Sequence, residues 1–197
     1  KRRKAYQINC RLENRGGELN AYTTKEDTTI HATTLRSDFA KAVELVADVA
    51  FNSTFPEKEL SKEREVIVEE INPYKDSPAD MIFDTFEDSI FAGSELGHNI
   101  LGTKAALMRH TSESIKQFVA RTHTTDQMVF SSIGNMSVKS VQNIAAKYLA
   151  EQEATTRAFK RSAPVAVEPF ERVVNKHTHQ THCIVGARAY DINDDKR

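Results

Sequence analysis

The sequence predicts an α+β fold, in which a mostly antiparallel sheet packs with helices. Apolar residues recur at helical spacing in several stretches, and short strand-like runs rich in Thr, Val and Ile stand between them. Strands and helices do not alternate regularly, which argues against a doubly wound parallel sheet. Apolar residues make up 39% of the 197 residues and charged residues 28%, as is typical of a globular protein.

The first part of the chain is predicted to form a helix and then a β-hairpin. An apolar pair four residues apart indicates a helix ending within residues 5–14, and the Gly-Gly pair that follows breaks it. Strand-like runs cover residues 18–24 and 28–35, and the short polar stretch between them favours a hairpin.

Three helices are predicted next. Ser37 is expected to cap the first, Pro56 stands at the start of the second over residues 57–74, and Ser77-Pro78 opens the third. Residues 93–110 are predicted to be a loop. The apolar stripe of the first helix is Phe39, Val43, Val46 and Ala50, and that of the third is Ile82, Phe86 and Ile90.

The remainder of the chain is predicted to contain two capped helices and further strands. Thr111 and Ser137 are expected to cap helices on either side of a strand over residues 128–133. Two more strand-like runs fall within residues 170–190. The predicted organisation is a first region over 1–150, an extended linker rich in charge and proline over 151–169, and the start of another region over 170–197.

Composition excludes several classes of function. A formal net charge of −1 gives no electrostatic reason to expect nucleic acid as a partner, and no apolar run is long enough for a membrane-spanning helix. Cys10 and Cys183 are too few for a disulfide framework, which favours a cytoplasmic location and leaves the periplasm open. Because the chain starts at Lys1 and stops at Arg197, just after a strand-like run, we expect a fragment of a longer protein.

Three glutamates fall where the helix over 57–74 should be apolar. At about 100° per residue, Glu59, Glu63 and Glu70 lie inside the apolar arc, and Glu63 and Glu70 nearly superimpose, roughly 10 Å apart along the axis. The apolar arc consists of Leu60, Val66, Ile67, Ile71 and Tyr74. A carboxylate on a buried face is costly unless it is paired or binds a metal. The alternative is a solvated Glu/Lys face with local ion pairs, and Glu59 could lie at its rim.

Other candidate sites carry less information. His177, His179, His182 and Cys183 form a possible metal cluster, but one strand would direct His177 and His179 to one face and His182 to the other. A partly exposed polar strand is the simpler interpretation. The sequence contains neither His-Glu-x-x-His nor its inversion, His-x-x-Glu-His, and it lacks a phosphate-binding glycine loop and a Gly-x-Ser-x-Gly elbow.

Several segments, taken in order, resemble the insulinase, pitrilysin and mitochondrial-processing-peptidase family. The matching segments are LENRGGELNAYTTKEDTTIHATTL, STFPEKELSKEREVIVEEI, LGHNILGT and a strand ending in Gly134-Asn135. The resemblance covers about residues 1–150 and continues more weakly into 171–197, as the opening of the family's next repeat. It implies a zinc peptidase with His-x-x-Glu-His on an N-terminal helix. In such proteins the motif lies just ahead of residues that resemble the start of this chain.

The resemblance implies roles for four residues. Glu70 matches the third zinc ligand. Glu63 matches a supporting catalytic carboxylate seven residues earlier on the same side of the helix. Asn20 and Ala21 match an edge strand on which an extended peptide substrate adds by main-chain pairing. A second homologous half or subunit is expected as a partner. Asn20 could instead merely shape the hairpin.

The missing motif limits what this chain can do alone. A catalytic zinc needs three protein ligands, so Glu70 by itself cannot hold the metal, and the fragment is expected to be metal-free and inactive. In the intact parent, zinc would lower the pKa of its bound water and the motif's glutamate would take the proton. Two alternatives stay open: a family subunit without the metal motif, acting as a scaffold or in substrate recognition, and metal sequestration by the 177–183 histidines.

Overall fold

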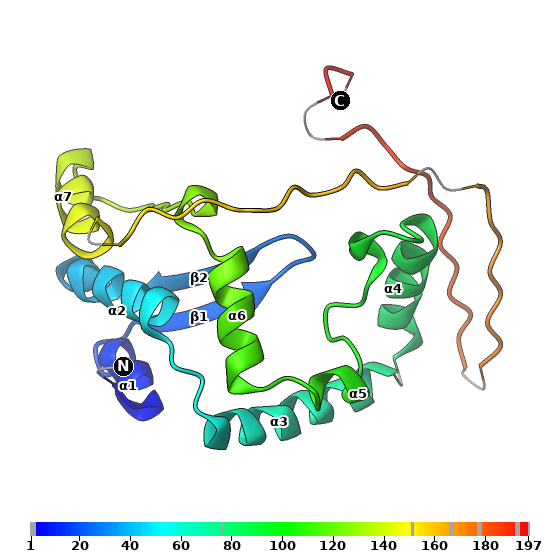
Figure 1. The fold of residues 1–197 in the computed structure, drawn as a ribbon, viewed down its shortest axis with the longest axis horizontal. Coiled ribbons are helices and arrows are strands. Elements are labelled where there is room, and N and C mark those ends of the chain that lie inside the picture. The colour runs from blue at the N-terminus through cyan, green and yellow to red at the C-terminus, as the bar shows by residue number, and fades with distance from the viewer. Residues whose placement is uncertain are drawn as a thin grey trace. The chain divides into compact units, whose positions relative to one another are not determined.

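The chain forms two compact units, which we describe separately. In the computed structural model, the first unit comprises residues 1–60 and 110–160, and the second comprises residues 61–109 and 161–197 (Figure 1). The structure describes residues 3–75, 77–150, 152–165, 168–176, 179–191 and 194–196. The region boundary at residue 150 drawn from the sequence stays a prediction.

Helices dominate the described residues. In chain order the elements are α1 (Ala5–Glu13), β1 (Glu18–Thr23), β2 (Thr28–Thr33), the 3₁₀ helix η1 (Arg36–Asp38), α2 (Phe39–Asn52), α3 (Glu57–Lys75), α4 (Pro78–Ile90), η2 (Glu95–Gly97), α5 (Lys104–Leu107), α6 (Ser112–Thr122), η3 (Thr125–Gln127) and α7 (Val138–Leu149). No helix among the described residues is long and apolar enough to cross a membrane.

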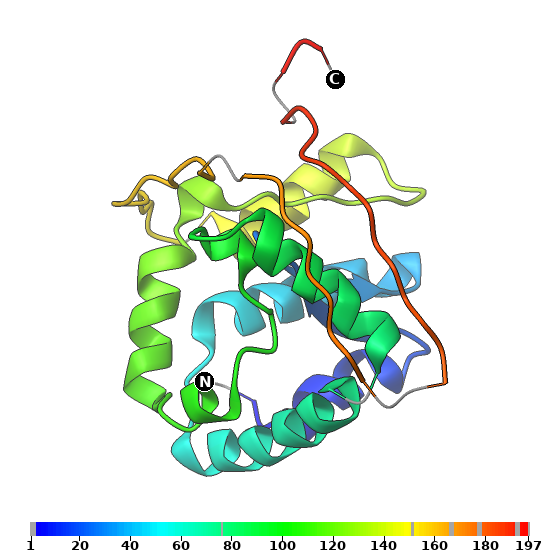
Figure 2. The ribbon, with the colours of Figure 1, turned by 90° about the vertical axis from the view of Figure 1, so that its right-hand side faces the viewer.

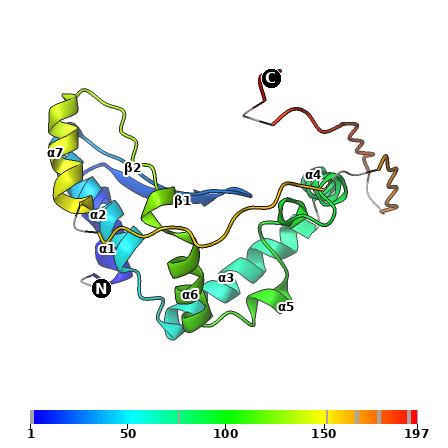
Figure 3. The same ribbon diagram turned by 45° about the horizontal axis from the view of Figure 1, so that its top comes forward.

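The predicted α+β fold with an antiparallel sheet is confirmed. β1 and β2 pair antiparallel, with Asn20 opposite His31 and Ala21 opposite Ile30. The helices α1, α2 and α7 gather near one end of this hairpin, and its loop extends away from them (Figure 3). The hairpin depends on Gly17, because a Cβ there would lie 2.8 Å from the carbonyl oxygen of Thr33.

The core of the first unit forms where α1 and α2 meet the hairpin. Leu12, Ala42 and Leu45 are buried together, and Ile8, Leu19 and Ala32 pack against them. Leu12 lies in the last turn of α1, and Leu45 lies mid-way along α2. The buried face of α2 consists of Ala42, Val43, Leu45 and Ala47, so of the predicted apolar stripe only Val43 is buried. This packing holds β1, which carries Asn20 and Ala21, against α1 and α2.

An ion-pair network joins α1 to α2 beside this core. Glu44 accepts hydrogen bonds from Arg3 and Arg11, and Arg3 also donates to Asp48 at 2.8 Å. Burial by itself would raise the pKa of Glu44, but the two guanidinium groups outweigh it and lower that pKa below its usual value. The carboxylate therefore stays ionised and ties both the segment just before α1 and the last turn of α1 to α2.

The second unit is organised around α4. The ring centroids of Phe86 and Phe170 lie 6.0 Å apart. A Cβ on Gly186 would come within 2.8 Å of the Phe86 ring. Glycine at 186 thus allows the C-terminal segment to approach the aromatic side chain closely. Figure 2 draws residues 179–190 as an extended trace, without the arrow of a strand.

Two kinds of local prediction were wrong. The strand over 128–133 is absent, since that segment is extended but unpaired, with Val129 90% and Ile133 103% exposed. The strand-like runs of 170–190 are likewise unpaired where the structure describes them. β propensity favours an extended backbone, but a strand also needs a hydrogen-bonding neighbour, and among the described residues these segments pair with none.

Capping was predicted correctly for α6 and α7 but not for α2. Thr111 accepts from the backbone of Ser114, and Ser137 accepts from that of Ser140. Ser37 instead lies inside η1, and the buried Asp38 precedes α2 and pairs with Lys41. The predicted loop over 93–110 contains η2 and the short helix α5.

Candidate functional site

The helix that carries the candidate glutamates forms as predicted. The sequence predicts a helix over residues 57–74, and in the structure α3 spans Glu57–Lys75. Glu57 and Glu59 fall in the first turn, where carboxylates interact favourably with the positive end of the helix dipole. Pro73 lies inside the last turns, so its missing N–H leaves that end of the helix one hydrogen bond short.

Glu63 and Glu70 both point to solvent, which corrects the expectation that they lie on a buried face. Both residues are exposed, as is Glu59. Of the apolar arc only Ile71 is buried, at 3% exposure, while Val66 is 47% exposed. Leu60, Ile67 and Tyr74 are half-buried, so the arc is partly covered, whereas the exposed carboxylates carry no burial penalty. Their roles as metal ligand and supporting carboxylate stay predictions.

The candidate substrate strand is an open edge of the hairpin. Among the described residues the sheet consists of β1 and β2 alone, so β1 has one edge without a paired strand. Asn20 and Ala21 are exposed, and the Asn20 side chain accepts the backbone N–H of Ala21 at 2.8 Å. A peptide that added to this edge would meet main-chain groups without a strand partner, although the Ala21 N–H would first have to leave the Asn20 side chain.

The histidine cluster is only partly described. His177 lies outside the described residues, His179 and Cys183 are exposed, and His182 is half-buried. Across the described ranges, no group of three or more His, Cys, Asp or Glu side chains could hold a metal ion.

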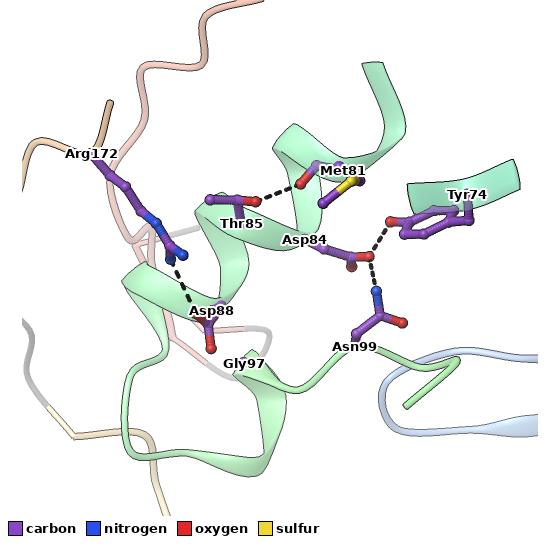
Figure 4. Close-up of a pocket in the computed structure, with 8 residues that line it drawn as sticks. All are labelled: Tyr74, Met81, Asp84, Thr85, Asp88, Gly97, Asn99 and Arg172. Atoms are coloured by element: carbon purple, nitrogen blue, oxygen red, sulfur yellow. Dashed lines mark hydrogen bonds and ion pairs between the residues drawn. The ribbon is translucent and has the colours of Figure 1, made fainter. Parts of the chain in front are cut away.

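A polar cluster that the sequence reasoning missed joins three segments of the second unit. Asp84 of α4 accepts hydrogen bonds through one carboxylate oxygen from the Tyr74 hydroxyl and from the Asn99 side-chain amide (Figure 4). The cluster borders a pocket of about 220 Å³ lined by Tyr74, Met81, Asp84, Thr85, Asp88, Gly97, Asn99 and Arg172. Burial, followed by the nearby Asp84 carboxylate, raises the pKa of Tyr74 to about 12. The signal in the sequence was weak: a tyrosine at the end of an apolar arc.

The resemblance implies a zinc site, and the side chains around Glu70 show how much of its ligand set this chain supplies. Glu70 supplies a carboxylate, which is a suitable zinc ligand, and it is accessible. A catalytic zinc site needs three protein ligands, and the described residues do not complete such a set around Glu70. The described part of the chain therefore presents Glu70 as one candidate ligand, without a full zinc site around it.

Comparison with solved structures defines the fold class. A protease from Helicobacter pylori superposes with a TM-score of 0.74 at 22% sequence identity, covering 86% of this chain and 41% of that one. At this identity the likeness shows a fold shared with peptidase structures.

Family models identify the family itself. The model described as insulinase (peptidase family M16) matches residues 1–104, and the model described as peptidase M16 inactive domain matches residues 109–197. The chain belongs to the insulinase family of peptidases, as the resemblance implied.

Curated relatives carry peptidase names and are longer than this chain. An uncharacterized zinc protease of Bacillus subtilis, YmxG, is 32% identical over 182 residues, which cover 92% of this chain and 44% of the relative. A probable mitochondrial-processing peptidase subunit beta of Schizosaccharomyces pombe is 29% identical over 169 residues, covering 86% and 37% respectively. The chain thus spans less than half the length of these relatives.

Proposed function

We propose that this chain is part of a zinc metalloendopeptidase that hydrolyses peptides or small unfolded proteins, with Glu70 as one of the zinc ligands. The observation that carries the proposal is an accessible carboxylate at 70, on a helix within the region matched by the insulinase family model. The zinc-protease name of the Bacillus relative supports it. Zinc, when bound, supplies a polarised water for attack on the peptide bond.

Glu63 and the open hairpin edge would serve the same reaction. Glu63 precedes Glu70 by seven residues, which places the two carboxylates on one side of α3. Asn20 and Ala21 would bind the substrate backbone as an added strand, and the Asn20 side chain would release the Ala21 N–H when the peptide arrives. Such pairing selects extended, unfolded peptides rather than a particular sequence.

The proposal includes a limit on this chain alone. Because the chain lacks the His-x-x-Glu-His motif, we infer that it neither retains zinc nor cleaves peptides by itself. Elemental analysis of the purified chain tests this inference: we expect substoichiometric zinc, and one zinc per chain would contradict it.

The activity is tested in the full-length product of the same reading frame. We expect it to cleave an internally quenched fluorescent peptide, to lose activity with a chelator, and to regain it with added zinc. We expect Asn20→Ala to raise KM, whereas Asn14→Ala, at an exposed position before the hairpin, should behave as wild type. A full-length protein that carries the His-x-x-Glu-His motif and binds zinc, yet cleaves none of a panel of unfolded peptides, would contradict the proposal.

A non-catalytic subunit is the second candidate function. The observation that favours it is the match of residues 109–197 to the model described as peptidase M16 inactive domain. The Schizosaccharomyces relative is named as a subunit, which makes a second homologous chain or half a reasonable partner for this one. The coding sequence immediately before Lys1 separates the candidates: the motif there supports the enzyme, and its replacement supports a scaffold or substrate-recognition subunit.

A further inference from the structure

The end of α3 that follows Glu70 lacks one helical hydrogen bond and is also held by tertiary contacts. Pro73 has no N–H, so the helical hydrogen bond that this residue would donate is missing one turn after Glu70. Tyr74 is the next residue, and its hydroxyl bonds to the Asp84 carboxylate and lies 3.3 Å from the carbonyl oxygen of Asp80. The last turn of α3 is thereby fastened to α4.

The same carboxylate oxygen also holds a loop. Asn99 donates its amide to Asp84, while its side-chain oxygen accepts the backbone N–H of Leu101 at 2.7 Å. The two contacts fix Asn99 at both ends of its side-chain amide. Figure 4 shows Tyr74 and Asn99 converging on Asp84 from separate segments. One side chain therefore joins α3, α4 and the loop at 99–101.

The Tyr74 hydroxyl remains a hydrogen-bond donor up to strongly alkaline pH. With its pKa raised to about 12, the Tyr74 hydroxyl stays protonated and donates to the carboxylate. Charge-assisted hydrogen bonds of this kind are stronger than neutral ones, and half-burial of Tyr74 reduces competition from water. The pairing is suited to keeping a helix end in place.

We propose that Asp84 is a positioning residue: through Tyr74 it fixes the turn of α3 that carries Glu70, and through Asn99 it fixes the loop beside that turn. Glu70 precedes Tyr74 by four residues, or about one helical turn, so motion of Tyr74 displaces Glu70 with it. The inference rests on the proposed function for its catalytic meaning, and its structural part can be measured on this chain without metal or substrate.

Hydrogen exchange on the purified chain measures the structural part. Asp84→Ala should speed exchange of the backbone amides of residues 70–72, 74 and 75, and of Leu101, about tenfold. Tyr74→Phe removes only the hydroxyl, so it should speed exchange of the backbone amides of residues 70–72, 74 and 75 while leaving the exchange rate of the Leu101 amide within twofold of wild type. Asp84→Asn keeps one oxygen that can accept both bonds, so it should restore most of the protection.

Asp88→Ala is the matched control. Asp88 lies one turn further along α4 and pairs with Arg172 at 3.2 Å, with both side chains about half exposed, and the alanine substitution has the same helix-propensity effect at both positions. We expect Asp88→Ala to leave the exchange rates at the end of α3 and at Leu101 within twofold of wild type. Equal exchange in Asp84→Ala, Tyr74→Phe and wild type would overturn the inference, and Tyr74→Phe decides the matter if Asp84→Ala fails to fold.

The kinetic part distinguishes positioning from simple stability. In the full-length protein, Asp84→Ala should lower kcat about tenfold with KM within twofold, and Asp84→Asn should recover most of kcat. An unchanged kcat beside faster exchange would overturn the positioning role. If wild-type full-length protein has no peptidase activity at all, the proposed function fails, while the exchange result still decides whether Asp84 holds this end of α3.

Discussion

Replacing Glu44 with glutamine should destabilise the first unit by about 2 kcal/mol. Glu44 accepts hydrogen bonds from Arg3 and Arg11, and the side chains involved are 17–34% exposed. A hydrogen bond to a charged group contributes roughly 1.5–3 kcal/mol, and partial exposure reduces this through solvent screening. Glutamine retains one acceptor oxygen but loses the charge, so the estimate is the loss of about one such bond.

Urea denaturation of the purified chain, followed by far-UV circular dichroism, measures this loss. Glu13→Gln is the control, because Glu13 is an exposed residue of α1. Since the folded-state pKa of Glu44 is lowered, its stabilisation is present above the ordinary glutamate pKa of 4.5 and disappears as pH falls. The difference between wild type and Glu44→Gln should therefore shrink below about pH 4. Neutral surface substitutions change the free energy of unfolding by up to about 0.5 kcal/mol. If Glu44→Gln lowers it by less than about 0.5 kcal/mol at pH 7, or by an amount independent of pH, the reasoning is refuted.

Three further predictions concern the core, the polar cluster and the substrate edge. Leu45→Ala removes a fully buried side chain, so we expect a loss of about 3 kcal/mol by urea denaturation, and a loss under about 1 kcal/mol would contradict the assigned core. Because folding raises the pKa of Tyr74 from 10.0 to about 12, its contribution is present below pH 10 and lost between these values. Wild type should lose more stability than Tyr74→Phe across that interval, and parallel pH profiles would show that the hydroxyl contributes nothing. Asn20→Ala in the full-length protein should raise KM several-fold, and unchanged kinetics would remove Asn20 from the site.

The hairpin and most helices could be predicted because their signals are local. The interval 57–74 nearly coincides with α3, and the runs at 18–24 and 28–35 shorten only at their ends. Gly-Gly before the hairpin and the capping residues Thr111 and Ser137 act on neighbouring backbone groups. Strand 128–133 failed because pairing depends on a distant neighbour, which local propensity cannot specify.

The candidate site was predicted only in part for the same physical reason. Helical projection places Glu63 and Glu70 on the side of the apolar arc, but it cannot tell which residues of that side become buried, and both glutamates are exposed. The cluster of Tyr74, Asp84 and Asn99 depends on α3 turning back into α4, a tertiary feature with no local pattern. The family membership itself followed from ordered segments of sequence and is confirmed by the family models.

The zinc content of the full-length protein, with and without the Glu70 carboxylate, tests the central claim most directly. Wild type and Glu65→Gln, a substitution at an exposed position of the same helix, should each carry one zinc per chain. Glu70→Gln should lose most of it while keeping the wild-type circular dichroism spectrum. A Glu70→Gln protein that retains stoichiometric zinc with undiminished affinity would contradict the assignment of Glu70 as a metal ligand.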